Sequence, residues 1–236
     1  IAGAICTGTH GTGISFGNLS TQVCQIEFIN GKGEIISCSE NENAELFKTV
    51  QVSLGVMGIL TEITIKCIDS YVLELRVEKE PIEDILQRLH GLNKDNRNFE
   101  FYWFPNTKWA MTKKLNIVNA IPENNAFKDY LQETVLENYA FKAVCELSYR
   151  IPSFTHQLSA LSAATVSSYQ KTKKSFEVYS TRRLVRFNEM EYNIPAEAYP
   201  DTKKELMKWM KKNNKEVLFP VENRFVKKDD IYLSPA

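Results

Sequence analysis

The sequence predicts an α+β fold, in which strands and helices do not alternate regularly. Three observations predict it: stretches in which apolar and polar residues alternate, stretches with apolar residues at helical spacing, and no repeating strand–helix unit. The composition shifts near residue 69, which divides the chain into a smaller unit, residues 1–68, and a larger one, residues 69–236. With 236 residues, the chain is long enough for both units to bury a core.

The first unit is predicted to contain a hairpin, a helix and a third strand. Residues 21–38 alternate on both sides of the letters NGKG, and Asn-Gly is the strongest short signal for a hairpin turn. Residues 39–55 carry apolar residues at helical spacing and end at a glycine. Residues 58–69 alternate and are rich in β-branched side chains, so we expect a strand there.

The second unit is predicted to contain further strands and several helices. Proline marks the start of one helix, the end of another and an expected edge strand, where Pro220 fits best. The expected strands cover residues 71–81, both sides of 105–107, 175–180, 185–195 and 216–226, and the expected helices cover 81–92, 125–150, 153–169 and 196–214.

Charge and cysteine usage exclude several classes of function. The 29 basic and 29 acidic residues cancel, so neither nucleic acid nor a membrane surface is expected as a general partner. No apolar run approaches the ~18 residues that span a bilayer. The five cysteines are odd in number and lack C-x-x-C spacing, so we expect no metal site and a reducing, cytoplasmic compartment.

Residues 1–17, IAGAICTGTHGTGISFG, are unusually rich in glycine and threonine. Such a segment lets the backbone approach a ligand closely, often a phosphate. A Walker-type loop is excluded because no lysine follows the glycines, and a dinucleotide fingerprint is excluded by its spacing and by the strand that follows. We also set aside a lipase-type oxyanion loop. A tight turn around a structurally satisfied His10 remains open as the alternative to a ligand site.

Four segments carry a family pattern in order along the chain. They are the glycine-rich residues 2–23, VSLGVMGILTEITIKC at 52–67, VRFNEMEYNIP at 185–195 and VENRFVKKDDIYLSPA at 221–236. Together they resemble the FAD-linked aldonolactone oxidases of the vanillyl-alcohol-oxidase superfamily, which include L-gulonolactone oxidase, D-arabinono-1,4-lactone oxidase and alditol oxidase. The resemblance implies that residues 1–68 are the C-terminal part of a PCMH-type FAD-binding domain and that residues 69–236 form a substrate cap with a large antiparallel sheet.

The resemblance implies FAD as the cofactor, held by backbone amides and hydroxyls near its pyrophosphate. Ile59 would lie against the adenosine end through its backbone, and an ordinary buried strand residue is the alternative for this position. The implied cofactor-binding residues are Thr7, Gly8, Thr9, His10, Gly11, Thr12, Gly13 and Ile59.

Glu222 and Arg224 lie two residues apart on an expected strand, so their side chains share a face. Spacing alone also allows a solvated ion pair. The resemblance implies that both are catalytic: Glu222 accepts a hydrogen bond from the reacting hydroxyl, and Arg224 holds a neighbouring hydroxyl or the lactone carbonyl. The implied reaction transfers a hydride from a CH–OH group of a sugar-1,4-lactone or alditol to flavin N5, with oxygen or another acceptor taking the electrons.

Two alternatives stay open: a dehydrogenase of the same superfamily that uses another electron acceptor, and a non-catalytic carbohydrate-binding module. Glu189 and Glu191 are expected to form structural ion pairs with Arg182, Arg183 or Arg186. The chain starts within an apolar run, so we expect a piece of a longer protein that is inactive alone; membrane association of that protein is left open.

Overall fold

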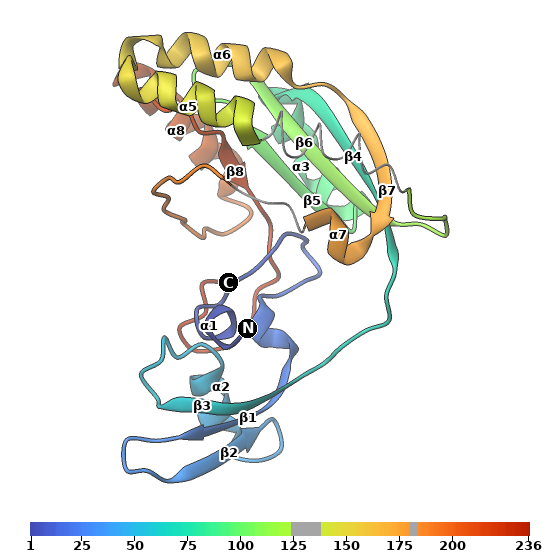
Figure 1. The fold of residues 1–236 in the computed structure, drawn as a ribbon, viewed down its shortest axis with the longest axis vertical. Helices are drawn as coiled ribbons and strands as arrows, with labels where there is room; N and C mark the ends of the chain where they lie inside the picture. Colours follow the sequence, from blue (N-terminus) through green and yellow to red (C-terminus); the bar gives the residue numbers. More distant parts are fainter. Residues whose placement is uncertain (124–137, 180–183) are drawn as a thin grey trace. The chain divides into compact units, whose positions relative to one another are not determined.

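The computed structural model describes residues 1–123, 138–179 and 184–236, which form two compact units (Figure 1). Unit 1 consists of Ile1–Asp69 and Phe225–Ala236, and unit 2 consists of Ser70–Arg224. Unit 2 is therefore an insertion within the chain of unit 1. The sequence placed residues 225–236 in the second unit, whereas the structure places them in unit 1. The roles expected for the two units stay predictions.

Unit 1 contains the predicted hairpin, helix and third strand. The strands form an antiparallel sheet in the order β2-β1-β3, and its core includes Ile5, Phe28 and Phe47. The short first helix, which contains Gly3, was not expected. The elements are α1 (Ala2–Cys6), the 3₁₀ helix η1 (Leu19–Gln22), β1 (Val23–Ile29), β2 (Ile35–Ser39), α2 (Ala44–Gln51) and β3 (Ile59–Ile65).

Buried Asn18 holds the returning residues 225–236 in unit 1. Its side-chain oxygen accepts hydrogen bonds from the first turn of η1, and its Nδ2 donates to Asp229 at 2.9 Å and to Ser234 at 2.8 Å. Tyr232 donates to Glu45 of α2 at 2.9 Å. Without Asp229 and Ser234, the buried side-chain amide of Asn18 would have unsatisfied donors. These contacts explain why residues 225–236 lie in unit 1.

Unit 2 is built on a five-stranded antiparallel sheet in the order β7-β4-β6-β5-β8. In Figure 1, α3 lies behind this sheet and α7 lies in front of it. The described elements are β4 (Val72–Pro81), α3 (Ile82–Asp95), β5 (Asn98–Trp103), β6 (Trp109–Ile117), α5 (Phe141–Arg150), the 3₁₀ helix η3 (Pro152–Phe154), α6 (Thr155–Thr165), β7 (Tyr169–Lys174), α7 (Ser175–Tyr179), α8 (Tyr199–Lys212) and β8 (Val221–Asn223).

The strand β5 lies between β6 and β8 and is buried on both faces over most of its length. Its alternation places Phe99, Phe101 and Trp103 on one face and Glu100 and Tyr102 on the other. β8 starts directly after Pro220 and forms an edge of the sheet, as the proline predicted.

Two predicted strands of unit 2 are wrong. Residues 175–179 form α7, where Glu177 Oε2 accepts from the Lys174 N–H and Val178 packs into the core below; a run this short cannot be assigned by periodicity. Residues 185–195 form no regular element and are largely exposed. They pair with no strand of the described residues, so their preference for a strand is not realised. Much of the helix expected at 125–150 lies outside the described residues; its described end is α5.

Candidate functional site

The glycine-rich segment leaves the end of α1 through residues that are already hydrogen-bonded. The N–H groups of Thr7, Gly8 and Thr9 donate to carbonyls of the first five residues, at 3.0 to 3.2 Å. Gly8 has φ of +64°, and a Cβ there would lie 2.7 Å from a ring carbon of Pro235. The amides of these three positions therefore close the helix, and Gly8 is required by its conformation and its neighbour.

Thr12 and Gly13 hold the far end of the segment to the returning chain. Phe225 N–H donates to Thr12 Oγ1 at 3.2 Å, and Gly13 N–H donates to the Phe225 carbonyl at 2.6 Å. Both residues are buried, whereas Thr7, Thr9 and Gly11 are exposed. Within residues 7–13, then, Thr7, Thr9 and Gly11 are exposed and His10 is partly exposed.

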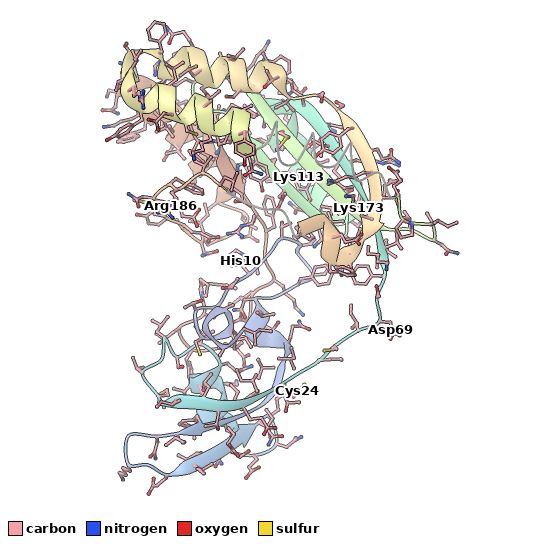
Figure 2. The ribbon with its side chains drawn as sticks, viewed as in Figure 1. His10, Cys24, Asp69, Lys113, Lys173 and Arg186 are labelled. Carbon is pink, nitrogen blue, oxygen red and sulfur yellow. The ribbon has the colours of Figure 1, made fainter. Side chains whose placement is uncertain are left out.

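His10 lies in this accessible part, where Figure 2 labels it. Its Nδ1 is 2.9 Å from the Gly11 carbonyl, so the ring is held by its own turn. A Cβ at Gly11 would meet no atom within 4 Å, which leaves this backbone open to a close approach.

The exposed part of the segment fits the pyrophosphate of FAD. Residues 1–26 contain no Asp or Glu, so no carboxylate of this stretch would repel an anion. Threonine hydroxyls and backbone amides are suitable donors for phosphate oxygens. Among the described residues, no group of three or more His, Cys, Asp or Glu side chains is arranged to hold a metal ion.

Ile59 opens β3 and is 72% exposed. The alternative of an ordinary buried strand residue is therefore wrong for this position. The preceding Gly58 has φ of +145°, and a Cβ there would lie 2.1 Å from the carbonyl oxygen of Ile29. Gly58 thus allows the backbone to enter the sheet and places Ile59 at the surface.

Residues 13–17, GISFG, do have the spacing G-x-S-x-G, which the sequence reasoning overlooked. A nucleophile elbow places its serine on a turn between a strand and a helix. Here the segment follows α1 and loop residues and leads to η1, so that context is missing. A lipase-type site is therefore still set aside, on this structural ground.

Glu222 lies in the edge strand β8, Arg224 directly follows it, and their side chains approach each other. The Arg224 Nε is 3.8 Å from Glu222 Oε1, and their side chains are 27% and 41% exposed. One guanidinium nitrogen of Arg224 also donates to both carboxylate oxygens of Glu191, at 2.9 and 3.0 Å. Both side chains are thus accessible and held by partners.

Glu191 was expected to pair with Arg182, Arg183 or Arg186, which stays a prediction, and the structure pairs it with Arg224. The first two of those arginines lie outside the described residues. The third segment of the family pattern therefore supplies the carboxylate that orients Arg224.

Tyr102 and Glu100 extend the site, and the sequence reasoning missed both. Tyr102 pairs with Glu222 across β5 and β8, and its hydroxyl is 3.0 Å from Glu222 Oε1 and 3.0 Å from Glu100 Oε1. Lys113 of β6, labelled in Figure 2, lies 3.4 Å from Glu100 Oε1. In the sequence NFEFYW, Glu100 and Tyr102 alternate with aromatic residues, and this alternation is the signal from which both could have been found.

Burial and the two neighbouring carboxylates raise the pKa of Tyr102 above its usual range, so the phenol keeps its proton at neutral pH. Lys113 also stacks over the Tyr102 ring, with its Nζ 4.6 Å from the centroid.

The opposite face of β8 carries Asn223, which fixes this edge strand to the sheet. Its Nδ2 donates to the Phe101 carbonyl at 3.1 Å, and its Oδ1 accepts from Lys203 at 3.2 Å and from Tyr199 at 2.5 Å. Burial lowers the pKa of Lys203 from 10.5 to about 7. A buried polar cluster of α8 and β8 therefore lies behind Glu222 and Arg224.

Comparison with known proteins decides the family. The sequence model for D-arabinono-1,4-lactone oxidase matches residues 63–236. The chain belongs to this family. The aldonolactone oxidase family is FAD-dependent, so the resemblance to this family and the cofactor implied by it are confirmed.

Relatives of known activity match the whole chain. L-gulono-1,4-lactone dehydrogenase of Mycobacterium tuberculosis is 30% identical over 236 residues, which cover 100% of this chain and 54% of that protein. L-gulonolactone oxidase of Bos taurus is 28% identical and is covered to 53%. The chain thus spans about half the length of these relatives.

The fold is also found among solved structures. A cholesterol oxidase from Brevibacterium sterolicum superposes with a TM-score of 0.64 at 14% identity, covering 94% of this chain and 49% of that one. The predicted α+β fold is therefore confirmed. No helix of the described residues is long and apolar enough to cross a membrane.

Proposed function

We propose that the intact protein oxidises a CH–OH group of an L-gulono-, L-galactono- or D-arabinono-type 1,4-lactone, or of an alditol, with FAD as its cofactor. The observation that carries the proposal is the pairing of an accessible carboxylate, Glu222 of β8, with an accessible guanidinium, Arg224, which directly follows that strand. An acceptor beside a planar set of donors suits a substrate with adjacent hydroxyl and carbonyl groups.

Each side chain has a separate task in this proposal. Glu222 accepts a hydrogen bond from the reacting hydroxyl and takes its proton. Arg224, oriented by Glu191, donates to a neighbouring hydroxyl or to the lactone carbonyl. FAD, when bound, accepts the hydride from the carbinol carbon.

Some of the predicted cofactor-binding residues 7–13 would contact FAD, and the others hold the backbone of this segment in place. Thr9, His10 and Gly11 supply the accessible donors and backbone for the pyrophosphate. Thr7, whose hydroxyl donates to the Gly3 carbonyl at 2.9 Å, gives the segment its path together with Gly8, Thr12 and Gly13. Exposed Ile59 offers its backbone to the adenosine end.

We propose oxygen as the electron acceptor. The names of the relatives include both a dehydrogenase and an oxidase, so a dye or cytochrome acceptor is the competing outcome. Oxygen consumption during turnover, compared with reduction of an added dye, separates the two.

The decisive experiment is anaerobic reduction of the intact protein. Its visible flavin spectrum is recorded before and after addition of a panel of aldonolactones and alditols. We expect bleaching by one class of substrate, and almost none in Glu222→Gln. Glu74→Gln is the matched control, because Glu74 lies in the same sheet and pairs with Arg76 at 2.6 Å. A colourless protein that takes up no FAD contradicts the proposal.

A further inference from the structure

The two carboxylate oxygens of Glu222 have different surroundings. Oε1 lies 3.0 Å from the Tyr102 hydroxyl oxygen and 3.8 Å from Arg224 Nε. Oε2 accepts no hydrogen bond from any residue within 1–123, 138–179 or 184–236, although the side chain is accessible to solvent. One oxygen is therefore held by the protein, and the other can accept a hydrogen bond from a ligand.

Tyr102 supplies the hydrogen bond that orients this carboxylate. Its phenol donates to Oε1 at 3.0 Å, whereas the 3.8 Å between Oε1 and Arg224 Nε is too long for a hydrogen bond. One terminal nitrogen of Arg224 donates to both oxygens of Glu191 instead. Arg224 thus attracts Glu222 by its charge, and Tyr102 sets the direction of the carboxylate.

The phenol is itself held in place without a ligand. Tyr102 is the register partner of Glu222 across β5 and β8, and β5 lies inside the sheet. Lys113 stacks over the phenol ring, with its Nζ 4.6 Å from the centroid. Burial raises the pKa of Tyr102, so the hydroxyl remains a donor at neutral pH.

The phenol has one hydrogen and two acceptors, because Oε1 of Glu100 also lies 3.0 Å from its oxygen. The two carboxylates differ in their other partners. Lys113 pairs with Glu100 at 3.4 Å, so a cation compensates Glu100 without the phenol. Among the described residues, Glu222 has no hydrogen-bond donor other than Tyr102, so we expect the phenol hydrogen to point mainly toward Glu222.

We propose that Tyr102 is a positioning residue, which holds Oε1 of Glu222 so that Oε2 accepts the hydrogen bond from the reacting hydroxyl. This inference rests on the proposed function. The terminal torsion of a glutamate is broad and roughly two-fold, so an accessible carboxylate without this bond would sample several orientations.

The proposed orientation assigns the proton transfer to one atom. The substrate O–H bond breaks and its proton forms a bond to Oε2, while the electron pair of that O–H bond completes the carbonyl group. The carbinol carbon at the same time gives up its hydride to the bound cofactor. Tyr102 keeps its own proton and its bond to Oε1 throughout, so the carboxylate does not turn during the reaction.

Crystal structures of the intact wild type and of Tyr102→Phe test the orientation without turnover. In the wild type we expect one oxygen of Glu222 within about 3.2 Å of the Tyr102 hydroxyl. In Tyr102→Phe we expect the carboxylate to rotate or to adopt alternative conformers while β5 and β8 stay paired. Tyr199→Phe removes a buried phenol from the opposite face of β8, and Glu222 should keep its wild-type orientation there. A wild type without the contact, or an identical Glu222 in Tyr102→Phe, overturns the proposal.

Anaerobic flavin reduction at increasing lactone concentration tests the consequence for the reaction. At saturating lactone we expect reduction of Tyr102→Phe to be at least about tenfold slower, because misplacing a reacting group by about 1 Å has such an effect. The half-saturating concentration should change less than about threefold, since Arg224 is unaltered, and Tyr199→Phe should change less than about threefold in both quantities.

A smaller fall in Tyr102→Phe, or an equal fall in Tyr199→Phe, overturns the positioning role, because a general loosening of the sheet would affect both variants alike. A wild type that no lactone or alditol reduces contradicts the proposed function. In that case the crystal structures still decide whether Tyr102 orients Glu222.

Discussion

Replacing Lys203 by methionine should change how the stability of unit 2 depends on pH. Lys203 is 3% exposed, and burial lowers its pKa from 10.5 to about 7. Between these values the unfolded chain binds a proton that the folded unit does not, so the free energy of unfolding rises with pH. The slope is about 1.4 kcal/mol per pH unit for one proton. Below about pH 7 both states are protonated, and above 10.5 neither is.

The full difference between the two pKa values, about 3.5, corresponds to a penalty of about 5 kcal/mol for the buried charge. Lys203→Met removes this penalty and also the bond to Asn223 and the contact with the Trp103 ring. From pH 8 to pH 9 we expect the wild type to gain about 1.4 kcal/mol relative to Lys203→Met.

Denaturant unfolding followed by tryptophan fluorescence measures this difference, because all three tryptophans, Trp103, Trp109 and Trp209, lie in unit 2. Lys204→Met is the matched control, because Lys204 is the next residue along the chain and its own side chain is 57% exposed. Identical pH slopes in the wild type and Lys203→Met would refute the reasoning, because Lys203 would then titrate alike in both states.

Three further substitutions test the described geometry. Gly58→Ala should destabilise unit 1 by about 2–4 kcal/mol through its φ and the clash with a backbone carbonyl, whereas Gly31→Ala has open space; thermal melts compare them. Asn18→Ala should cost about 2 kcal/mol and make residues 225–236 susceptible to limited proteolysis, and unchanged cleavage would count against the anchor. Arg224→Lys should raise KM at least about tenfold, because lysine lacks the second nitrogen that faces Glu222 while the first binds Glu191; an unaltered KM would remove Arg224 from substrate binding.

Local patterns predicted the fold of unit 1 well. The Asn-Gly hairpin, the helix at 44–51 and the strand at 59–65 each depend on signals within a few residues. Residues 175–179 failed because a five-residue run satisfies both periodicities and burial decides between them. The position of residues 225–236 depends on Asn18, more than 200 residues away, and no local pattern reports such a contact.

The closeness of Glu222 and Arg224 was predicted from their spacing, whereas the residues that contact them were missed. A strand has a period of two residues, so side chains two positions apart are expected on one face. The partners Tyr102 and Glu191 reach them only through the register of β5 with β8 and through an irregular segment, so spacing along the sequence could not reveal either.

Because unit 2 is inserted into the chain of unit 1, recombination could exchange unit 2 as a single segment. The chain leaves unit 1 after Asp69 and returns at Phe225, one residue beyond Arg224. Recombination at these two junctions would transfer Glu222 and Arg224 together with the sheet that supports them, while the glycine-rich segment stayed with the recipient. Under the proposed function, exchange of unit 2 alone would replace the residues proposed to bind the substrate and leave the glycine-rich segment unchanged.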